Sequence, residues 1–216
     1  MVIIVVYCNV VRHIRITLIL NKEITMNTQY TSYHRGYKIM ANEDLHCINE
    51  IMDAIVDSIE GYTSSYSRTF VVNFGLNYPQ ATHSEGNKPM QMFMDRFKKY
   101  LTVRGLRHVY VWVREQKSSD NPHYHCLLLL DGRKIQNSFG IMEEAKRLWG
   151  AINDCDGAGL VHYPHAPAML RTDSQAYTEE IEMCVFHTSY LAKKNTKGSA
   201  PCRQREYGYS RKKPWE

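Results

Sequence analysis

Hydrophobic residues recur along this chain with two different periods, and these periods predict which segments are helices and which are strands. Apolar side chains at three- and four-residue spacing predict amphipathic helices over residues 43–60, 89–103 and 142–152. Runs rich in β-branched and aromatic residues predict strands over 70–76, 107–115 and 123–130, with a short strand over 159–163. The order predicts an α+β fold, with helices packed on an antiparallel sheet of about five strands.

Two histidines at the start of one predicted strand are the first candidate for chemistry. His123 and His125 stand two residues apart, a spacing that places both side chains on one face of a strand. The polar residues 116–122 favour a turn, so we expect a hairpin that brings Glu115 next to His123. A carboxylate with two imidazoles suits Mg²⁺ or Mn²⁺ and would also bind Zn²⁺. The alternative is three polar residues on a solvated strand.

A tyrosine near the end of another predicted helix is the second candidate. Residues 174–194 carry acidic side chains in the first turns and lysines in the last, which favours a helix. Tyr190 and Lys193 are three residues apart and share one side of it. A phenol with a pKa of about 10 is a weak nucleophile, and a nearby ammonium group would make it a better one. Taken alone, such a pair is more often an interfacial aromatic residue beside solvated lysines.

The remaining histidines of this half of the chain give weaker signals. His162 and His165 are separated by Pro164 and do not align on a strand, so we expect them on a surface loop. His187 stands one helical turn before Tyr190. It is expected either to border the site or to be a partly buried polar residue.

The order of the elements resembles a known family. A strand over 67–76 ends in Asn-Tyr-Pro, and is followed by the strand ending at Glu115, the His123-x-His125 strand and the Tyr190-x-x-Lys193 helix. This order resembles the HUH endonucleases of the rolling-circle replication initiator type, which have an RRM-like core. Residues 190–198 and 205–211 resemble the YagK/YfjJ-type proteins, akin to replication endonucleases of filamentous phages. The resemblance runs from residue 44 to residue 211.

The resemblance implies a function and a set of roles. The protein would nick and join single-stranded DNA through a 5′-phosphotyrosine intermediate, with a divalent cofactor, Mg²⁺ or Mn²⁺, held by Glu115, His123 and His125. Tyr190 would be the nucleophile and Lys193 would stabilise charge. Lys194 occupies the position of a second tyrosine, which implies a single-tyrosine mechanism. Residues 73–75 also depart from the Thr or Leu common in related initiators.

The implied partner is single-stranded or hairpin DNA at an origin, together with a host helicase and polymerase. A relaxase or a single-strand transposase would use the same site on a different DNA element. Outside the enzymes, the alternative is a DNA-binding regulator with a vestigial site.

Positive charge is concentrated near the C-terminal end. Residues 193–213 contain eight Lys or Arg against one Glu, a net +7 that leaves −2 for the remainder of a chain whose total is +5. Aromatic residues are interleaved with these cations, a pattern that suits phosphates and unstacked bases. The alternative is a solubilising tail. The predicted DNA-binding residues are Lys194, Lys197, Arg203, Arg205, Arg211, Lys212 and Lys213.

The spacing of the cysteines and the composition of the N-terminal segment support the remaining predictions. The six cysteines are widely spaced and form no Cys-x-x-Cys pair, so we expect free thiols and a cytoplasmic location, with no membrane partner. Charged residues interrupt the apolar run over residues 1–20, which is too short to span a bilayer. We expect residues 1–25 to be an upstream artefact before a start at Met26, or else an additional edge strand. The predicted organisation is an endonuclease domain over 26–200 and a basic tail over 201–216.

Overall fold

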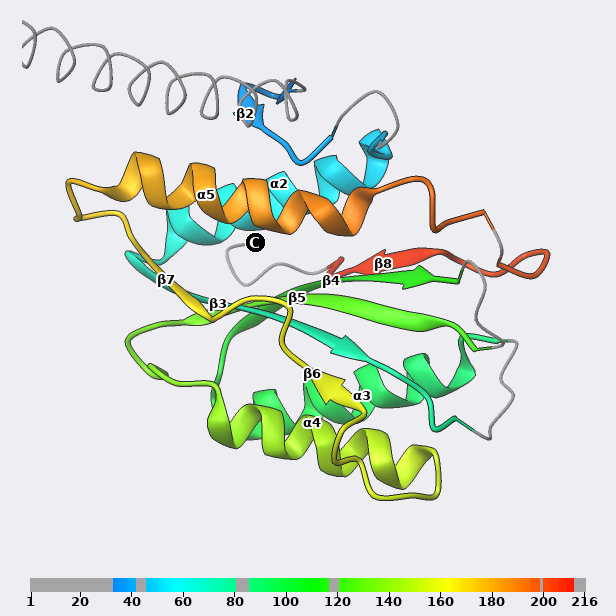
Figure 1. The fold of residues 1–216 in the computed structure, drawn as a ribbon. Helices are drawn as coiled ribbons and strands as arrows, with labels where there is room; N and C mark the ends of the chain where they lie inside the picture. The colour runs from blue at the N-terminus through cyan, green and yellow to red at the C-terminus, as the bar shows by residue number, and fades with distance from the viewer. Residues whose placement is uncertain (1–32, 42–45, 81–85, 117–120, 199, 212–216) are drawn as a thin grey trace, which may run out of the picture.

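A computed structural model describes residues 33–41, 46–80, 86–116, 121–198 and 200–211. In these ranges, four α-helices pack on an antiparallel sheet (Figure 1), which confirms the predicted α+β class. The helices are α2 (Asn49–Ser65), α3 (Lys88–Val103), α4 (Phe139–Ile152) and α5 (Tyr177–Ser189), and one 3₁₀ turn, η1 (Tyr190–Ala192), follows α5.

The main sheet has six strands in the described residues, one more than expected. They are β3 (Arg68–Leu76), β4 (His108–Glu115), β5 (His123–Asp131), β6 (Val161–His162), β7 (Ala168–Arg171) and β8 (Tyr207–Tyr209). The order is β6-β3-β5-β4-β8, and β7 pairs with the first half of β3. The predicted hairpin is confirmed, because β4 and β5 pair with Glu115 opposite His123.

Helices cover both faces of the sheet, as Figure 1 shows, with α2 and α5 on one side and α3 and α4 on the other. Alternate residues of β4 and β5 therefore enter two different cores. Val111 and Leu127 pack with α2 and α5, whereas Trp112 and Cys126 pack with α3 and α4. By the same alternation, Glu115, His123 and His125 belong to the α2/α5 face. Cys126 is buried on the opposite face of β5 from the two histidines.

Several helix boundaries differ from the prediction, and α2 begins at Asn49 rather than at residue 43. The helix predicted to end at residue 60 continues through Gly61 to Ser65, because Tyr62 and Thr63 are buried and the Tyr62 hydroxyl donates to the Arg107 carbonyl at 2.8 Å. The helix predicted over 174–194 spans only Tyr177–Ser189. After η1 the chain turns to an extended conformation at Lys193, with ψ of 133°.

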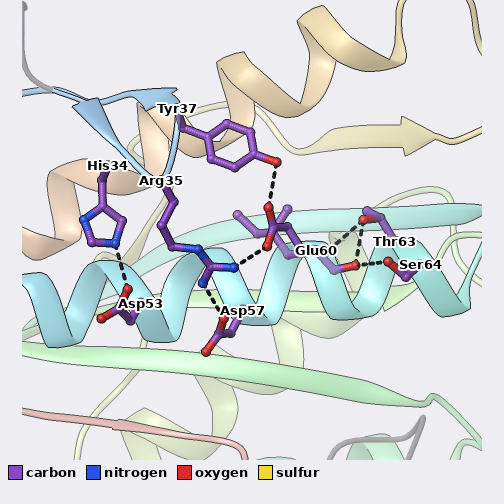
Figure 2. A network of polar contacts seen from close by, with 9 residues as sticks. His34, Arg35, Tyr37, Asp53, Asp57, Glu60, Thr63 and Ser64 are labelled. Atoms are coloured by element: carbon purple, nitrogen blue, oxygen red, sulfur yellow. Dashed lines mark hydrogen bonds and ion pairs between the residues drawn. The ribbon is translucent and has the colours of Figure 1, made fainter.

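A small hairpin that the sequence analysis did not predict is attached to α2. Strands β1 (Tyr33–His34) and β2 (Tyr37–Lys38) are joined by Arg35 and Gly36, which both have positive φ, as a two-residue hairpin turn requires. Figure 2 shows hairpin side chains reaching carboxylates on one side of α2. The contacts are His34 with Asp53 at 2.8 Å, Arg35 with Asp57 at 2.5 Å and Glu60 at 2.7 Å, and Tyr37 with Glu60 at 3.0 Å.

The segment predicted as a basic tail contributes a strand. Residues 207–209 form β8 at the edge of the sheet, so at least this part of the tail belongs to the folded domain. The proposed N-terminal extension, residues 1–25, lies outside the described residues, as do residues 212–216. Within the described ranges, no helix combines the length and apolar character that crossing a bilayer requires.

Candidate functional site

A row of imidazoles on β5 and β6 extends across β3. The ring centroids of His123 and His125 on β5 lie 6.4 Å apart. His125 stands opposite Gly75 on β3, and Gly75 stands opposite His162 on β6, whose ring lies 6.3 Å from that of His125. The expectation that His162 is a surface loop residue is therefore wrong.

Gly75 allows this row to form. A Cβ atom at this position would lie 2.2 Å from Cε1 of His162, well inside van der Waals contact. Only glycine leaves room for the imidazole to lie across β3. On its other side, Nδ1 of His162 is 3.4 Å from the side-chain nitrogen of Asn77.

Glu115 lies at the centre of a buried charge cluster. Its side chain is 3% exposed, and its two oxygens lie 3.2 Å from the ammonium groups of Lys193 and Lys197. Nε2 of His125 is 3.3 Å from Oε2 of the same carboxylate. The carboxylate therefore holds the central strands and the segment after α5 together.

Burial and neighbouring charges shift the pKa values of this cluster. Burial alone would raise the pKa of Glu115, but His125, Lys197 and Lys193 outweigh it and lower the pKa to about 2. Burial lowers the pKa of His123, and His125 adds to this effect. Burial also lowers the pKa of His162, with a further contribution from His125. An ionised carboxylate thus belongs to the same cluster as His123 and His162, whose lowered pKa values favour the neutral imidazole.

Tyr190 is linked to this cluster through Lys193. The Lys193 ammonium lies 3.7 Å from the centroid of the Tyr190 ring, a cation–π contact, while it also pairs with Glu115. The chain is fixed here by the segment before α2, because the Ile48 N–H donates to the Ala192 carbonyl at 2.8 Å. The Lys194 N–H likewise donates to the His46 carbonyl at 2.6 Å. Contacts thus run from Tyr190 through Lys193 and Glu115 to His125.

The donor atoms fit a divalent metal in their chemistry. An ionised carboxylate and neutral imidazoles are the forms that ligate metals. Among the described residues, however, no three His, Cys, Asp or Glu side chains are gathered as a complete metal site. Both oxygens of Glu115 are instead paired with lysines. An ion held by Glu115, His123 and His125 would have to share the carboxylate with these ammonium groups or replace them.

The predicted DNA-binding residues do not form one surface. Lys194 and Arg203 are exposed. Lys197 is not available for DNA in this arrangement, because its side chain is 1% exposed and paired with Glu115. Burial lowers the pKa of Lys197, and Glu115 opposes that shift. Lys212 and Lys213 lie outside the described residues.

Arg205 and Arg211 lie on the other side of the sheet from the histidines. They line a pocket of about 380 Å³ together with Lys98, Tyr110 and Trp112. Tyr110 and Trp112 belong to the α3/α4 face, so this basic, aromatic pocket faces away from Tyr190. The predicted basic cluster is therefore divided between two faces.

Sequence reasoning missed two members of the site. A short strand was predicted over 159–163, but His162 was assigned to a surface loop because Pro164 separates it from His165; Lys197 follows the helix in an irregular turn. One available signal was Gly75, since a glycine inside a strand often marks the close approach of another group.

Comparison with known proteins gives a family but no described relative. Neither a curated protein nor a solved structure matches the chain. The model of the YagK/YfjJ C-terminal domain matches residues 28–210, a range that includes the histidine row, Tyr190 and strand β8. The chain therefore belongs to the YagK/YfjJ C-terminal domain family.

Proposed function

We propose that this protein is an HUH-type endonuclease that nicks and rejoins single-stranded DNA to start rolling-circle replication of a phage, plasmid or integrated element. One observation carries the proposal: the chain of contacts from Tyr190 through Lys193 and Glu115 to His125. It joins a candidate nucleophile, a cation and metal-ligating groups in one place, although they come from three separate segments.

The proposed reaction exchanges one phosphodiester for another. The Tyr190 oxygen attacks phosphorus, a new O–P bond forms, and the bond from phosphorus to the 3′ oxygen breaks. The phenol proton passes to solvent, and the 3′ oxygen takes up a proton to become a hydroxyl. The 5′ end stays on Tyr190 as a phosphodiester, so the 3′-hydroxyl can prime synthesis and later reverse the step.

Lys193 has a defined part in this reaction. Its ammonium lies against the Tyr190 ring and its side chain is 8% exposed, so a phosphate brought to the tyrosine would meet a poorly solvated cation. Such a cation stabilises negative charge that develops on the phosphoryl oxygens. A divalent ion held by Glu115, His123 and His125 would supply Lewis-acid activation and orient the phosphate.

The test is the covalent intermediate. Incubation of the protein with labelled single strands that carry candidate origins, with Mn²⁺, is expected to give a protein–DNA adduct that survives denaturation. Mass spectrometry should place the nucleotide on the peptide containing Tyr190. Tyr190→Phe removes one oxygen and keeps the ring on which Lys193 rests, so this variant should fold and bind DNA but give no adduct.

Tyr177→Phe, at the start of the same helix, is the matched control and should still form the adduct. An adduct that persists in Tyr190→Phe would contradict the choice of nucleophile. Binding of DNA without any adduct across the tested strands and metals would instead favour the regulator with a vestigial site. A relaxase or transposase would form the same adduct and differ only in the DNA that it accepts.

A further inference from the structure

A cavity beside the candidate site has no part in the proposed reaction. It has a volume of about 400 Å³ and lies between α5, β7 and β3. Its apolar wall includes Met169, Leu170 and Met183, and Met183 is 53% exposed. Its polar wall includes Asn73, Glu180 and His187. A cavity of this size lies within the roughly 300–1,000 Å³ typical of small-ligand sites.

Three polar atoms in this wall are buried without a partner. They are Oδ1 of Asn73, Oε2 of Glu180 and Nδ1 of His187. In the described part of the chain, five side-chain atoms are of this kind, so most of them gather around one cavity. Buried polar groups are almost always hydrogen-bonded. A cluster of buried polar atoms without partners therefore points to a missing ligand or water.

The chemistry of these atoms selects the ligand. An amide oxygen and a carboxylate oxygen are acceptors, so the ligand must offer N–H or O–H donors. Burial, reinforced by His165, lowers the pKa of His187, so its imidazole favours the neutral form and presents one acceptor nitrogen. The rings of His165 and His187 lie 4.6 Å apart at 49° to one another, and either face could stack on a flat heterocycle.

The cavity lies close to the candidate site. Asn73 stands two residues before Gly75 on the same face of β3, about 7 Å along the strand. His187 stands on α5, three residues before Tyr190, which begins η1. A base carried by a nucleotide close to the phosphate at Tyr190 could therefore reach this cavity.

We propose that this cavity binds one nucleobase that carries an exocyclic amino group, and that the base belongs to the strand cleaved at Tyr190. The proposal rests on the proposed function for its substrate. Adenine, cytosine and guanine offer amino donors to Glu180 and Asn73. Thymine offers a single N–H flanked by two carbonyl acceptors, which would face acceptors in the wall.

The experiment uses the Tyr190→Phe protein, so that binding is measured without chemistry. Single strands with one abasic position at a time are titrated against it by fluorescence anisotropy. One position close to the cleaved phosphate is expected to matter most. Loss of its base, or its replacement by thymine, should weaken binding about tenfold or more, the effect of losing a hydrogen bond to a charged group.

Glu180→Gln should produce the same loss on the intact strand and no additional loss on the abasic strand. Its melting temperature should change little, because Oε2 of Glu180 has no hydrogen-bond partner to lose. Glu182→Gln is the matched control, since Glu182 is exposed on the same helix and does not line the cavity. Equal behaviour of the two variants, or a scan in which no position matters, would overturn the proposal.

Free nucleosides form the second arm. Weak binding of adenosine, cytidine or guanosine, absent for thymidine and lost in Glu180→Gln, is expected for a base site that a strand fills. Tight nucleoside binding that DNA does not compete with would overturn the assignment to the strand. Failure of the wild-type protein to form an adduct, with these binding results intact, would refute the proposed function and leave the base site standing.

Discussion

A single carboxylate holds most of the candidate site together. Glu115 is the only acidic group in contact with the ammonium groups of Lys193 and Lys197 among the ion pairs of the described residues, and both lysine side chains are at most 8% exposed. Buried cations are stable only while they are paired, because an isolated charge in a low-dielectric interior is strongly disfavoured. Glu115 is therefore a structural residue as well as a candidate ligand.

Glu115→Gln is consequently expected to destabilise the fold, since it leaves two buried ammonium groups without a counter-charge. The loss should be about 3–5 kcal/mol in the free energy of unfolding, the usual effect of breaking a buried pair. Urea denaturation measures it. Lys197→Met in the same protein should recover part of the loss, because it removes one of the stranded charges.

Glu143→Gln is the control for this prediction. Glu143 forms an exposed pair with Lys146 on α4, and its removal should change stability by at most about 1 kcal/mol. If Glu115→Gln were no more destabilising than Glu143→Gln, the two lysines would not depend on Glu115.

A second prediction concerns Gly75 and His162. Gly75→Ala forces the new methyl group against the imidazole, and overpacking of this kind lowers stability by about 1–3 kcal/mol. His162→Ala removes the obstacle, so the double variant should be more stable than Gly75→Ala alone. A double-mutant cycle by urea denaturation tests this coupling. Simple additivity of the two changes would show that His162 does not lie over Gly75.

These residues show how far the sequence could predict the site. The two-residue spacing of His123 and His125, and the hairpin that brings Glu115 beside them, follow from strand geometry and were predicted. The lysine partners of Glu115 were not predicted, because Lys193 and Lys197 are about 80 residues away and no local feature of the sequence links them to Glu115. Lys197 appeared equivalent to the other cations of a basic run, and only the fold separates it from them.

At the scale of elements, β8 closes the sheet edge beside β4. Its central residue, Gly208, lies against the ring of Trp112, and a Cβ atom there would lie 2.7 Å from the ring. The Ser210 N–H donates to the Tyr110 carbonyl at 3.0 Å, and the Arg114 N–H donates to the Glu206 carbonyl at 2.7 Å. Without β8, the edge of β4 would be open to solvent.

Gly208→Ala is therefore expected to weaken the docking of β8 by about 1–3 kcal/mol, because the indole is buried and cannot move freely aside. Hydrogen exchange measures this locally. The Tyr110 and Arg114 amides donate to the β8 segment, at Ser210 Oγ and the Glu206 carbonyl, so their exchange should accelerate while exchange in β5 and β3 remains slow. Gly140→Ala is the control, since a Cβ atom there meets nothing within 4 Å. Equal exchange in both variants would contradict the close approach at Gly208.

The helices and strands that could be predicted are those with a clear period of hydrophobic residues. The apolar positions of α3 (Met90, Phe93, Met94, Phe97 and Leu101) are all buried as expected. Strand β6 lies inside the short strand predicted over 159–163, whereas β7 and β8 were not predicted. They have four and three residues, too few to show alternation, so their identity depends on pairing with β3 and β4. The extension of α2 past Gly61 likewise depends on the burial of Tyr62, which is a tertiary effect.

At the scale of the whole molecule, positive charge lies on both sides of the sheet. Lys193, Lys194 and Lys197 follow the candidate nucleophile on the α2/α5 side, while Arg205 and Arg211 line the pocket on the other side. Figure 1 shows β8 at the edge between the two sides, next to β4. A single strand bound at Tyr190 would have to pass round this edge to reach Arg205 and Arg211.

This arrangement predicts that the effect of the distal arginines depends on strand length. The double variant with Arg205→Gln and Arg211→Gln should bind a short strand of about 6 nucleotides as tightly as the unchanged protein does. It should bind a strand of about 24 nucleotides more weakly, because that length exceeds the roughly 4–16 nucleotides that one small domain contacts. For the long strand, the slope of log K against log salt should flatten by about 1.4, or roughly 0.7 for each lost phosphate contact. Lys146→Gln with Arg147→Gln is the control, because it removes the same charge from exposed residues of α4. If both double variants weakened short and long strands alike, the arginines would act only through net charge, and the strand would not cross the β8 edge.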